Sequence, residues 1–514
     1  MPFDPEPEVA LVNAFRDPYN TVVAAARTCY SKRIVLPADV DKDDASRALR
    51  DRIYASIYEA GHHTTIQHPT FQFVLAKVSR QFIWSFLHAH PFYNSEQVSQ
   101  RYVEVKKGNY VTPPLDGAAR ELYESTADEM MKAYADLQGI LKADIEREWF
   151  ALYPARRRDP AKWHDKIHKR VMEAARYVLP IATHAHLHHT VSGITLHRYH
   201  RLCDQFDTPT ETRAVVQKMV DEVNRLDPLF FKSIEDVVPI EQSPEFALFQ
   251  KTRAPSTFVA EFDRDLGPLR SKLVDWKVRA QESMAQAVRS VLGVPRESMT
   301  DEAAIEAVMH PAQNPILGES LVLTTMSKLS RAMNHPHFTF RKKLSHTADS
   351  QDQRHRMTPG SRPILEAQYR AGTPDFILPT VMERNAAALD TCRNLFRRVW
   401  NAIDELRSRG VPWEFAQYLL PNAFPIRFEE SGDLLNHHHK WTTRLCYLAQ
   451  EEIWRCCLEE VKQVSDVHPL LARHLRAPCT LRQEAGKTPY CPEGDRYCGV
   501  PVWTKALEKY ERVI

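Results

Sequence analysis

The stretch HHTTIQHPTFQFVLAKVSRQFIWSFLHAHPFYNSEQVSQRY, residues 62–102, organises this chain, because an altered copy of it occurs farther on. His68-Pro-Thr-Phe-Gln-Phe73 recurs as His335-Pro-His-Phe-Thr-Phe340, and both copies read as a short strand entered through a His-Pro turn. A cluster of histidine and arginine follows each strand: His88-Ala89-His90 in the first copy and Arg354-His355-Arg356 in the second. The copies are offset by 267 residues at the strands and by 266 at the clusters, and this regularity indicates an internal duplication.

The hydrophobic periodicity around these strands is helical. Apolar helical patterns cover residues 20–30, 43–60 and 79–87, a charged one runs through 115–175, and 285–292 repeats the first of them. We therefore expect an α+β fold of two related halves, each an antiparallel sheet flanked by long helices, packed as an internal pseudo-dimer. The expected boundaries are 1–245 for the first copy, 246–477 for the second, and 478–514 for a cysteine-containing tail.

Composition narrows the class of protein. The chain has 514 residues, 43 % of them hydrophobic and 26 % charged, which is typical of a globular protein with a substantial core. A net charge of +2 gives no support for a nucleic-acid partner or a membrane surface, and no run of about 20 apolar residues is present. The amino terminus, MPFDPEPEVA, lacks the basic and apolar regions of a signal peptide, so we expect a cytoplasmic location.

The cysteines and glycines argue against a disulfide framework and against the glycine-rich phosphate-binding loops. The nine cysteines are an odd number, which favours reduced thiols over a disulfide framework. Only 15 glycines occur, and neither GxGxxG nor GxxxxGK[ST] is present. Any phosphate must therefore be held by side chains and helix ends.

The string Ser95-Glu-Gln-Val-Ser-Gln-Arg-Tyr102 carries a specific resemblance. With Gly61-His62, the Phe-x-Phe strand and Val78-Ser79-Arg80 before it, the string resembles the flavin-dependent thymidylate synthases, whose signature is RHR, seven residues, then Ser-x-Arg-Tyr. This sequence departs twice from that signature: HAH replaces RHR, and eight residues precede Ser99. Downstream, Ala175-Arg-Tyr-Val-Leu-Pro180 is similar to the family's Ala-Arg-x-x-Leu-Pro block.

The second copy resembles the family in complementary places. It has an intact RHR at residues 354–356, and no Ser-x-Arg-Tyr follows it. Its Leu-Pro block, Ala416-Gln-Tyr-Leu-Leu-Pro421, has glutamine in place of arginine, and the stretch from His437 to Ile453 matches the family's closing helix. Because each copy lacks what the other keeps, the resemblance implies a composite site.

The resemblance also implies roles for these residues. Planar guanidinium groups and a hydroxyl suit a nucleotide phosphate, and cations suit a flavin pyrophosphate and a reduced flavin ring. The implied catalytic residues are Arg444, against the pyrimidine carbonyls, and Ser99. The implied substrate-binding residues are Ser99, Gln100, Arg101, Tyr102, Arg176 and Arg201. The implied cofactor-binding residues are Arg354, His355, Arg356, His439, His88 and His90.

The expected cofactor is FAD, with NADPH and methylenetetrahydrofolate as co-substrates and dUMP or a related pyrimidine nucleotide as substrate. Two chains are expected to associate as a homodimer that resembles the family's tetramer. Three functions stay open: methylation of dUMP, a flavoenzyme reaction on another pyrimidine nucleotide, and a non-catalytic nucleotide-binding or scaffold role.

The tail lies outside the resemblance. Cys479, Cys491 and Cys498 suggest a zinc site with His474 or His468 as fourth ligand, but their spacing is not that of a common zinc ribbon. Free buried thiols are the alternative.

Overall fold

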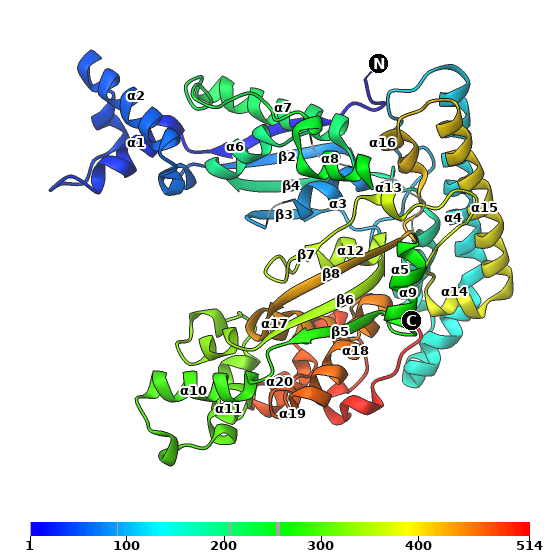
Figure 1. The fold of residues 1–514 in the computed structure, drawn as a ribbon. Coiled ribbons are helices and arrows are strands. Elements are labelled where there is room, and N and C mark those ends of the chain that lie inside the picture. The colour runs from blue at the N-terminus through cyan, green and yellow to red at the C-terminus, as the bar shows by residue number, and fades with distance from the viewer. Residues whose placement is uncertain (1, 90, 205–206, 253–256) are drawn as a thin grey trace. The chain divides into compact units, whose positions relative to one another are not determined.

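The computed structural model of the protein describes residues 2–89, 91–204, 207–252 and 257–514 (Figure 1). The chain forms two compact units, each made of three segments. Unit 1 comprises residues 1–131, 180–255 and 401–420, and unit 2 comprises residues 132–179, 256–400 and 421–514. The boundaries expected from the sequence are contiguous, whereas each observed unit contains a segment from the other half of the sequence.

Unit 1 contains a four-stranded antiparallel sheet in the order β1-β2-β4-β3. Its strands are β1 (Glu8–Ala14), β2 (Thr70–Ser79), β3 (Tyr93–Gln97) and β4 (His184–Ser192). Its helices are α1 (Pro18–Thr28), α2 (Asp44–Glu59), α3 (Arg80–His88), α6 (Gly193–Arg201), α7 (Pro209–Leu226), α8 (Pro244–Lys251) and α16 (Trp413–Ala416).

Unit 2 contains a second antiparallel sheet in the equivalent order β5-β6-β8-β7. Its strands are β5 (Ser271–Trp276), β6 (His337–Ser345), β7 (Gly360–Ser361) and β8 (Pro425–Asp433). Its helices are α5 (His164–Ala175), α9 (Phe258–Leu266), α10 (Ala280–Leu292), α11 (Asp301–Met309), α12 (His346–Asp352), α13 (Leu365–Gln368), α14 (Thr380–Arg384), α17 (Leu434–Arg444), α18 (Glu451–Val467), α19 (Pro469–Ala472) and α20 (Pro478–Glu484). The matching strand orders confirm the predicted α+β class with two similar halves.

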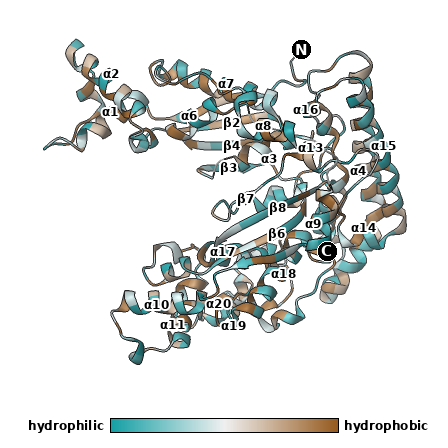
Figure 2. Ribbon diagram, viewed as in Figure 1, coloured by the Kyte–Doolittle hydropathy of each residue, from teal (hydrophilic) through white to brown (hydrophobic). Residues whose placement is uncertain are grey.

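Two long helices contain the boundaries between the units. These are α4 (Gly117–Leu152) and α15 (Ala386–Ser408), and both alternate hydrophilic and hydrophobic residues along their length (Figure 2). Within the described part of the chain, no helix combines the length and the apolar character needed to cross a bilayer.

The same local chemistry begins the helix after each central strand. Phe71, Phe73 and Leu75 alternate as fully buried residues along β2, which then runs into α3. Ser79 caps α3 by accepting a hydrogen bond from the Phe82 amide at 2.8 Å, and Ser345 caps α12 in the same way with the Ala348 amide at 3.2 Å. This strand, serine cap and helix therefore form one repeated unit.

A bulge accounts for the change in offset between the copies. The pairing of β2 with β4 is irregular between Leu75 and Val78, and Lys77 there has a φ of 56°. The equivalent pairing of β6 with β8 continues without interruption. One extra residue in β2 therefore reduces the offset from 267 to 266 before the clusters are reached.

Candidate functional site

Each unit contains a buried serine, glutamate and tyrosine that meet in the same way. In unit 1, Glu211 on α7 accepts hydrogen bonds from the Ser79 amide at 2.7 Å, from the Ser79 hydroxyl at 2.6 Å and from the Tyr418 hydroxyl. The tyrosine comes from the Leu-Pro block of the second half of the sequence. Burial raises the pKa of Glu211.

The arrangement in unit 2 is reciprocal. Glu452 on α18 accepts hydrogen bonds from the Ser345 amide at 2.7 Å, from the Ser345 hydroxyl at 2.6 Å and from the Tyr177 hydroxyl at 2.6 Å. Tyr177 comes from the Leu-Pro block of the first half of the sequence. Each sequence half thus supplies a tyrosine to the serine and glutamate of the other half, which explains why both units are discontinuous.

The Arg-His-Arg segment lies directly after α12 in unit 2. Arg444 at the end of α17 donates from Nε to Nε2 of His355 at 2.8 Å and from an Nη to the carbonyl of Gln351 at 2.8 Å. Burial, followed by the charge of Arg444, holds the pKa of His355 well below its usual range. His355 is therefore neutral, and because its Nε2 accepts a hydrogen bond from Arg444, its own proton is on Nδ1.

Several cationic and polar side chains around His355 are accessible to solvent. Arg354 and His439 are exposed, and Arg356 and Arg444 are half-buried. The ring of His439 lies 5.9 Å from that of His355, and burial followed by Arg444 lowers the pKa of His439. The segment therefore presents a dense group of cations and hydrogen-bond donors, held in place by Arg444.

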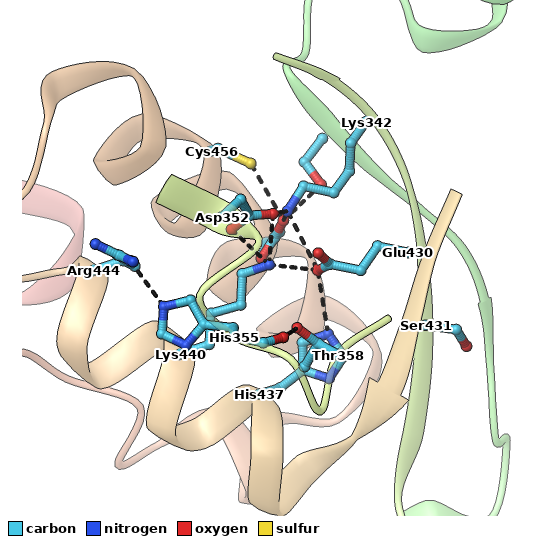
Figure 3. A network of polar contacts seen from close by, with 12 residues as sticks. Lys342, Asp352, His355, Thr358, Glu430, Ser431, His437, Lys440, Arg444 and Cys456 are labelled. Atoms are coloured by element: carbon cyan, nitrogen blue, oxygen red, sulfur yellow. Dashed lines mark hydrogen bonds and ion pairs between the residues drawn. The ribbon is translucent and has the colours of Figure 1, made fainter. Parts of the chain in front are cut away.

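A fully buried network of charged side chains supports this segment (Figure 3). Asp352, the last residue of α12, lies 2.9 Å from Nζ of Lys342 and 2.8 Å from Nζ of Lys440. Lys440 also lies 2.5 Å from Glu430, and Lys342 lies 3.0 Å from Glu460. All five side chains have 0 % exposure. The backbone carbonyl of Asp352 accepts from the His355 amide at 3.0 Å, which links the network to the Arg-His-Arg segment.

The protonation state of the network follows from its contacts. Burial and then the charge of Asp352 raise the pKa of Glu430 to about 7. Burial acts in the same direction on Asp352 and Glu460, but Lys342 and Lys440 outweigh it and hold the pKa of Asp352 well below its usual range and that of Glu460 at about 2. With Glu430 protonated, two lysines balance two carboxylates, which satisfies the requirement that buried charges be paired.

At the five positions of unit 1 that correspond to the charged network of unit 2, the side chains are apolar or aromatic. The strand registers and helix caps make Leu75, Phe86, His189, Tyr199 and Met219 the counterparts of Lys342, Asp352, Glu430, Lys440 and Glu460. Phe86 and Tyr199 have ring centroids 4.4 Å apart, and burial lowers the pKa of His189 to about 3, so that histidine is neutral. The two units therefore differ in chemistry at these five positions: charged and buried in unit 2, apolar or neutral in unit 1.

Sequence reasoning missed this network, although one signal was present. Phe338, Phe340 and Lys342 occupy alternate positions of β6 that all face the core, so a lysine stands where the period of two requires an apolar residue. A lysine in such a position requires a buried carboxylate. The partners come from α12, β8 and α18, which the sequence does not place.

The predicted residues of the first copy lie mostly in unit 1. Ser99, Gln100, Arg101 and Tyr102 form a turn after β3, in which the Ser99 hydroxyl accepts from the Arg101 amide at 3.2 Å. The guanidinium of Arg101 lies 5.4 Å from the centre of the exposed Tyr102 ring. The same unit contains Arg201, 3.6 Å from Glu235, and His88, whose ring lies 5.0 Å from that of Trp84. The predicted His90 lies outside the described residues.

Arg176 belongs to the other unit. It is 4 % exposed, and its carbonyl accepts from the amide of the Asn422 side chain at 2.9 Å in unit 2. The structure therefore brings Arg176 into the same unit as Arg354, His355, Arg356, His439 and Arg444. Ser99, Gln100, Arg101, Tyr102 and Arg201 are together in unit 1.

Two discontinuous units with sheets of equivalent strand order, exchanged tyrosines and an Arg-His-Arg segment define an α+β protein of two similar halves with a cationic site. The family model described as thymidylate synthase complementing protein matches residues 10–229 and 272–470. The chain belongs to this family, the flavin-dependent thymidylate synthases.

Curated relatives agree with this assignment. The chain is 27 % identical to a flavin-dependent thymidylate synthase of Clostridium tetani over 44 % of the chain and 85 % of the relative. It is 32 % identical to one of Nitratidesulfovibrio vulgaris over 27 % of the chain and 58 % of that relative. It is 30 % identical to one of Corynebacterium diphtheriae over 34 % of the chain and 62 % of that relative. The chain therefore spans about three fifths of the last two relatives.

The residues of unit 2 fit the flavin that the family implies. A flavin dinucleotide carries a pyrophosphate and, when reduced, a negatively charged ring, so it requires fixed cations and neutral donors. Arg354, Arg356 and Arg444 are residues that could supply such cations, and the Nδ1 proton of His355 could supply a neutral donor.

Proposed function

We propose that the protein methylates dUMP to dTMP with methylenetetrahydrofolate as carbon donor, FAD as cofactor and NADPH as reductant. The observation that supports this proposal best is the Arg-His-Arg segment of unit 2, held by Arg444, in a chain that matches the family in two regions. A cytoplasmic location belongs to the same proposal.

The chain's own residues have distinct parts in this proposal. The bound flavin supplies the hydride that reduces the transferred carbon. Arg354 and Arg356 offset the negative charge of the flavin pyrophosphate. His355, whose ring is kept uncharged by its environment, donates a hydrogen bond from Nδ1 to the cofactor. Arg444 stabilises negative charge that develops on the pyrimidine carbonyls.

Nucleotide binding is assigned to the first copy. By resemblance, Ser99, Gln100, Arg101 and Tyr102 hold the phosphate, and Arg201 of the same unit adds a planar guanidinium group. Arg176 is a substrate-binding residue by the same resemblance and lies in unit 2. No cysteine falls in either signature stretch, so attack on the pyrimidine by a protein thiolate is not part of the proposal.

A second candidate function has an observation in its favour. The first copy has His88-Ala89-His90 in place of RHR and an aromatic cluster beneath it, so only one intact flavin segment exists per chain. A flavoenzyme acting on another pyrimidine nucleotide, or a non-catalytic nucleotide-binding protein, is consistent with that loss.

The visible absorption spectrum of the purified protein, with and without added FAD, tests flavin binding before any substrate is chosen. The Arg354→Ala and Arg356→Ala double variant should be folded and colourless, and the His88→Ala and His90→Ala double variant should keep most of its flavin. Equal losses, or a larger loss from the histidine pair, would mean that the copies are assigned the wrong way round.

Product analysis then separates the functions. Incubation with dUMP, methylenetetrahydrofolate and NADPH should give dTMP. Flavin binding without dTMP, but with turnover of another pyrimidine nucleotide, would favour the second candidate, and absence of flavin would reject both enzymes.

The homodimer is a further part of the proposal. It is motivated by the family resemblance of a chain that already contains two copies. Light scattering at micromolar concentration should give twice the mass of one chain, and a strict monomer would contradict it.

A further inference from the structure

The tyrosine that the first half of the sequence contributes to unit 2 has a second hydrogen-bond partner. The Tyr177 hydroxyl donates to Glu452 at 2.6 Å and accepts from Nε2 of Gln450 at 2.6 Å. All three side chains are at most 2 % exposed. Because Glu452 takes the hydroxyl proton, the amide group of Gln450 must be the donor to the hydroxyl oxygen, and this fixes which way the Gln450 carboxamide points.

Gln450 passes this orientation on to Gln351, which lies in the last turn of α12. With its Nε2 bound to Tyr177, Gln450 turns its Oε1 the other way, and this oxygen accepts from Nε2 of Gln351. The backbone carbonyl of Gln351 accepts from an Nη of Arg444 at 2.8 Å. Arg444 in turn donates from Nε to His355 at 2.8 Å (Figure 3). A continuous path of hydrogen bonds therefore joins Tyr177 to the Arg-His-Arg segment.

The end of α12 benefits from such an anchor. This helix has only seven residues, and the last turn of a helix frays unless other groups hold it, because its carbonyls have no partners within the helix. The Arg-His-Arg segment follows this turn directly. Gln351 is held on its side chain by Gln450 and on its carbonyl by Arg444, so loss of the side-chain contact loosens the turn from which the segment starts.

Three residues of the path are replaced in unit 1, although unit 1 has the same buried serine, glutamate and tyrosine. By the strand registers and helix caps that relate the units, the replacements are Pro209 for Gln450, Ser85 for Gln351 and Cys203 for Arg444. A proline side chain neither donates nor accepts, so this position cannot link Tyr418 to the end of α3. The path therefore belongs to the unit that has the intact Arg-His-Arg segment.

We propose that Tyr177 and Gln450 are positioning residues of the cofactor site. They act through Gln351 and Arg444 to hold the Arg-His-Arg segment in place. This inference rests on the proposed function, because it takes that segment to be the flavin site. It gives Tyr177 a part that Tyr418 does not have, although both tyrosines donate to a buried glutamate. The first half of the sequence thereby supports a site whose Arg-His-Arg segment belongs to the second half.

FAD binding by two matched tyrosine variants tests the proposal. Tyr177→Phe removes the hydroxyl to which Gln450 donates, and Tyr418→Phe removes the same group from the equivalent glutamate of unit 1. The dissociation constant of FAD, measured by fluorescence titration of the full chain, should rise by about five- to tenfold in Tyr177→Phe, as for the loss of one buried hydrogen bond. It should stay within about twofold of wild type in Tyr418→Phe.

The reduction potential of the bound flavin distinguishes positioning from a general loss of stability. Fixed cations favour the negatively charged reduced ring, so the potential should fall in Tyr177→Phe and stay unchanged in Tyr418→Phe. A tyrosine with a purely structural part would change the melting temperature and leave the potential of the flavin that stays bound as in wild type.

A pair of glutamine variants keeps the test decisive if Tyr177→Phe does not fold. Gln450→Met removes both hydrogen bonds of the carboxamide and leaves the bond between Tyr177 and Glu452 intact. It should weaken FAD binding as much as Tyr177→Phe. Because Gln450 and Gln351 act through one path, the double variant Gln450→Met with Gln351→Met should weaken FAD binding no more than the stronger of the two single variants.

The outcomes separate this inference from the proposed function. Wild-type protein that binds no FAD would reject the flavin site, and with it the part given to Tyr177. FAD binding by wild type, with the same affinity and potential in Tyr177→Phe, Gln450→Met and Tyr418→Phe, would leave the flavin site standing and refute the positioning. Fully additive losses in the double glutamine variant would show that Gln450 and Gln351 act separately, which would also overturn the path.

Discussion

Lys440→Met tests whether the buried network of unit 2 is held together by balanced charge. The lysine is 0 % exposed and lies 2.8 Å from Asp352 and 2.5 Å from Glu430. Its removal leaves Lys342 alone against two ionised carboxylates, Asp352 and Glu460. An uncompensated buried charge costs about 3–5 kcal/mol, so the free energy of unfolding of unit 2 should fall by about that amount.

Differential scanning fluorimetry and urea unfolding measure this loss. For a unit of this size each kcal/mol shifts the melting temperature by about 2–4 °C, so a fall of about 6–20 °C is expected. Lys462→Met on α18 is the matched control, because that lysine is exposed and should change stability by less than about 0.5 kcal/mol. Flavin content should also fall, because the Asp352 carbonyl that positions His355 loses support.

A compensating variant gives the sharper test. Combining Lys440→Met with Asp352→Leu leaves Lys342, Glu460 and neutral Glu430, in which the charges balance again. The double variant should therefore recover much of the stability lost by Lys440→Met. If it is as unstable as the single variant, or if Lys440→Met costs less than about 1 kcal/mol, charge balance does not hold this network together.

Three further predictions follow from the same contacts. Folding raises the pKa of the Glu430 carboxyl group from 4.5 to about 7. The stability gained from its protonation is therefore complete below pH 4.5 and is lost, by roughly 3 kcal/mol, as pH rises to 7. Glu430→Gln should remove this pH-dependent loss in melting curves measured between pH 5 and 8. Tyr418→Phe and Tyr177→Phe each remove a hydrogen bond to a buried glutamate and should cost about 1.5–3 kcal/mol, seen as faster amide exchange around Ser79 in the first variant and around Ser345 in the second. A single variant that speeds exchange equally around both serines would contradict this assignment. Arg101→Ala and Arg176→Ala should each weaken dUMP binding by about 1.5–3 kcal/mol in calorimetry with flavin retained, and unchanged affinity in both would remove the phosphate from the first copy.

Much of the architecture could be predicted from local sequence. The alternation of Phe71, Phe73 and Leu75 specifies a strand with one buried face, and Ser79 and Ser345 start helices because their side chains accept free amides. The repeated spacing of these features indicated two related halves. Even the shift of one residue in the offset has a local cause, the bulge at Lys77.

Only the tertiary structure decided which segments the two halves exchange. It also decided which side chains pair with the buried charges. The Leu-Pro blocks are visible in the sequence, but the side of the molecule on which Tyr177 and Tyr418 pack depends on contacts with Glu452 and Glu211, hundreds of residues away. Likewise, Lys342 stands out in its strand, yet only the fold brings Asp352 and Glu430 to it. Periodicity specifies which face of an element is buried, and the pairing of buried polar groups is fixed only when distant elements pack together.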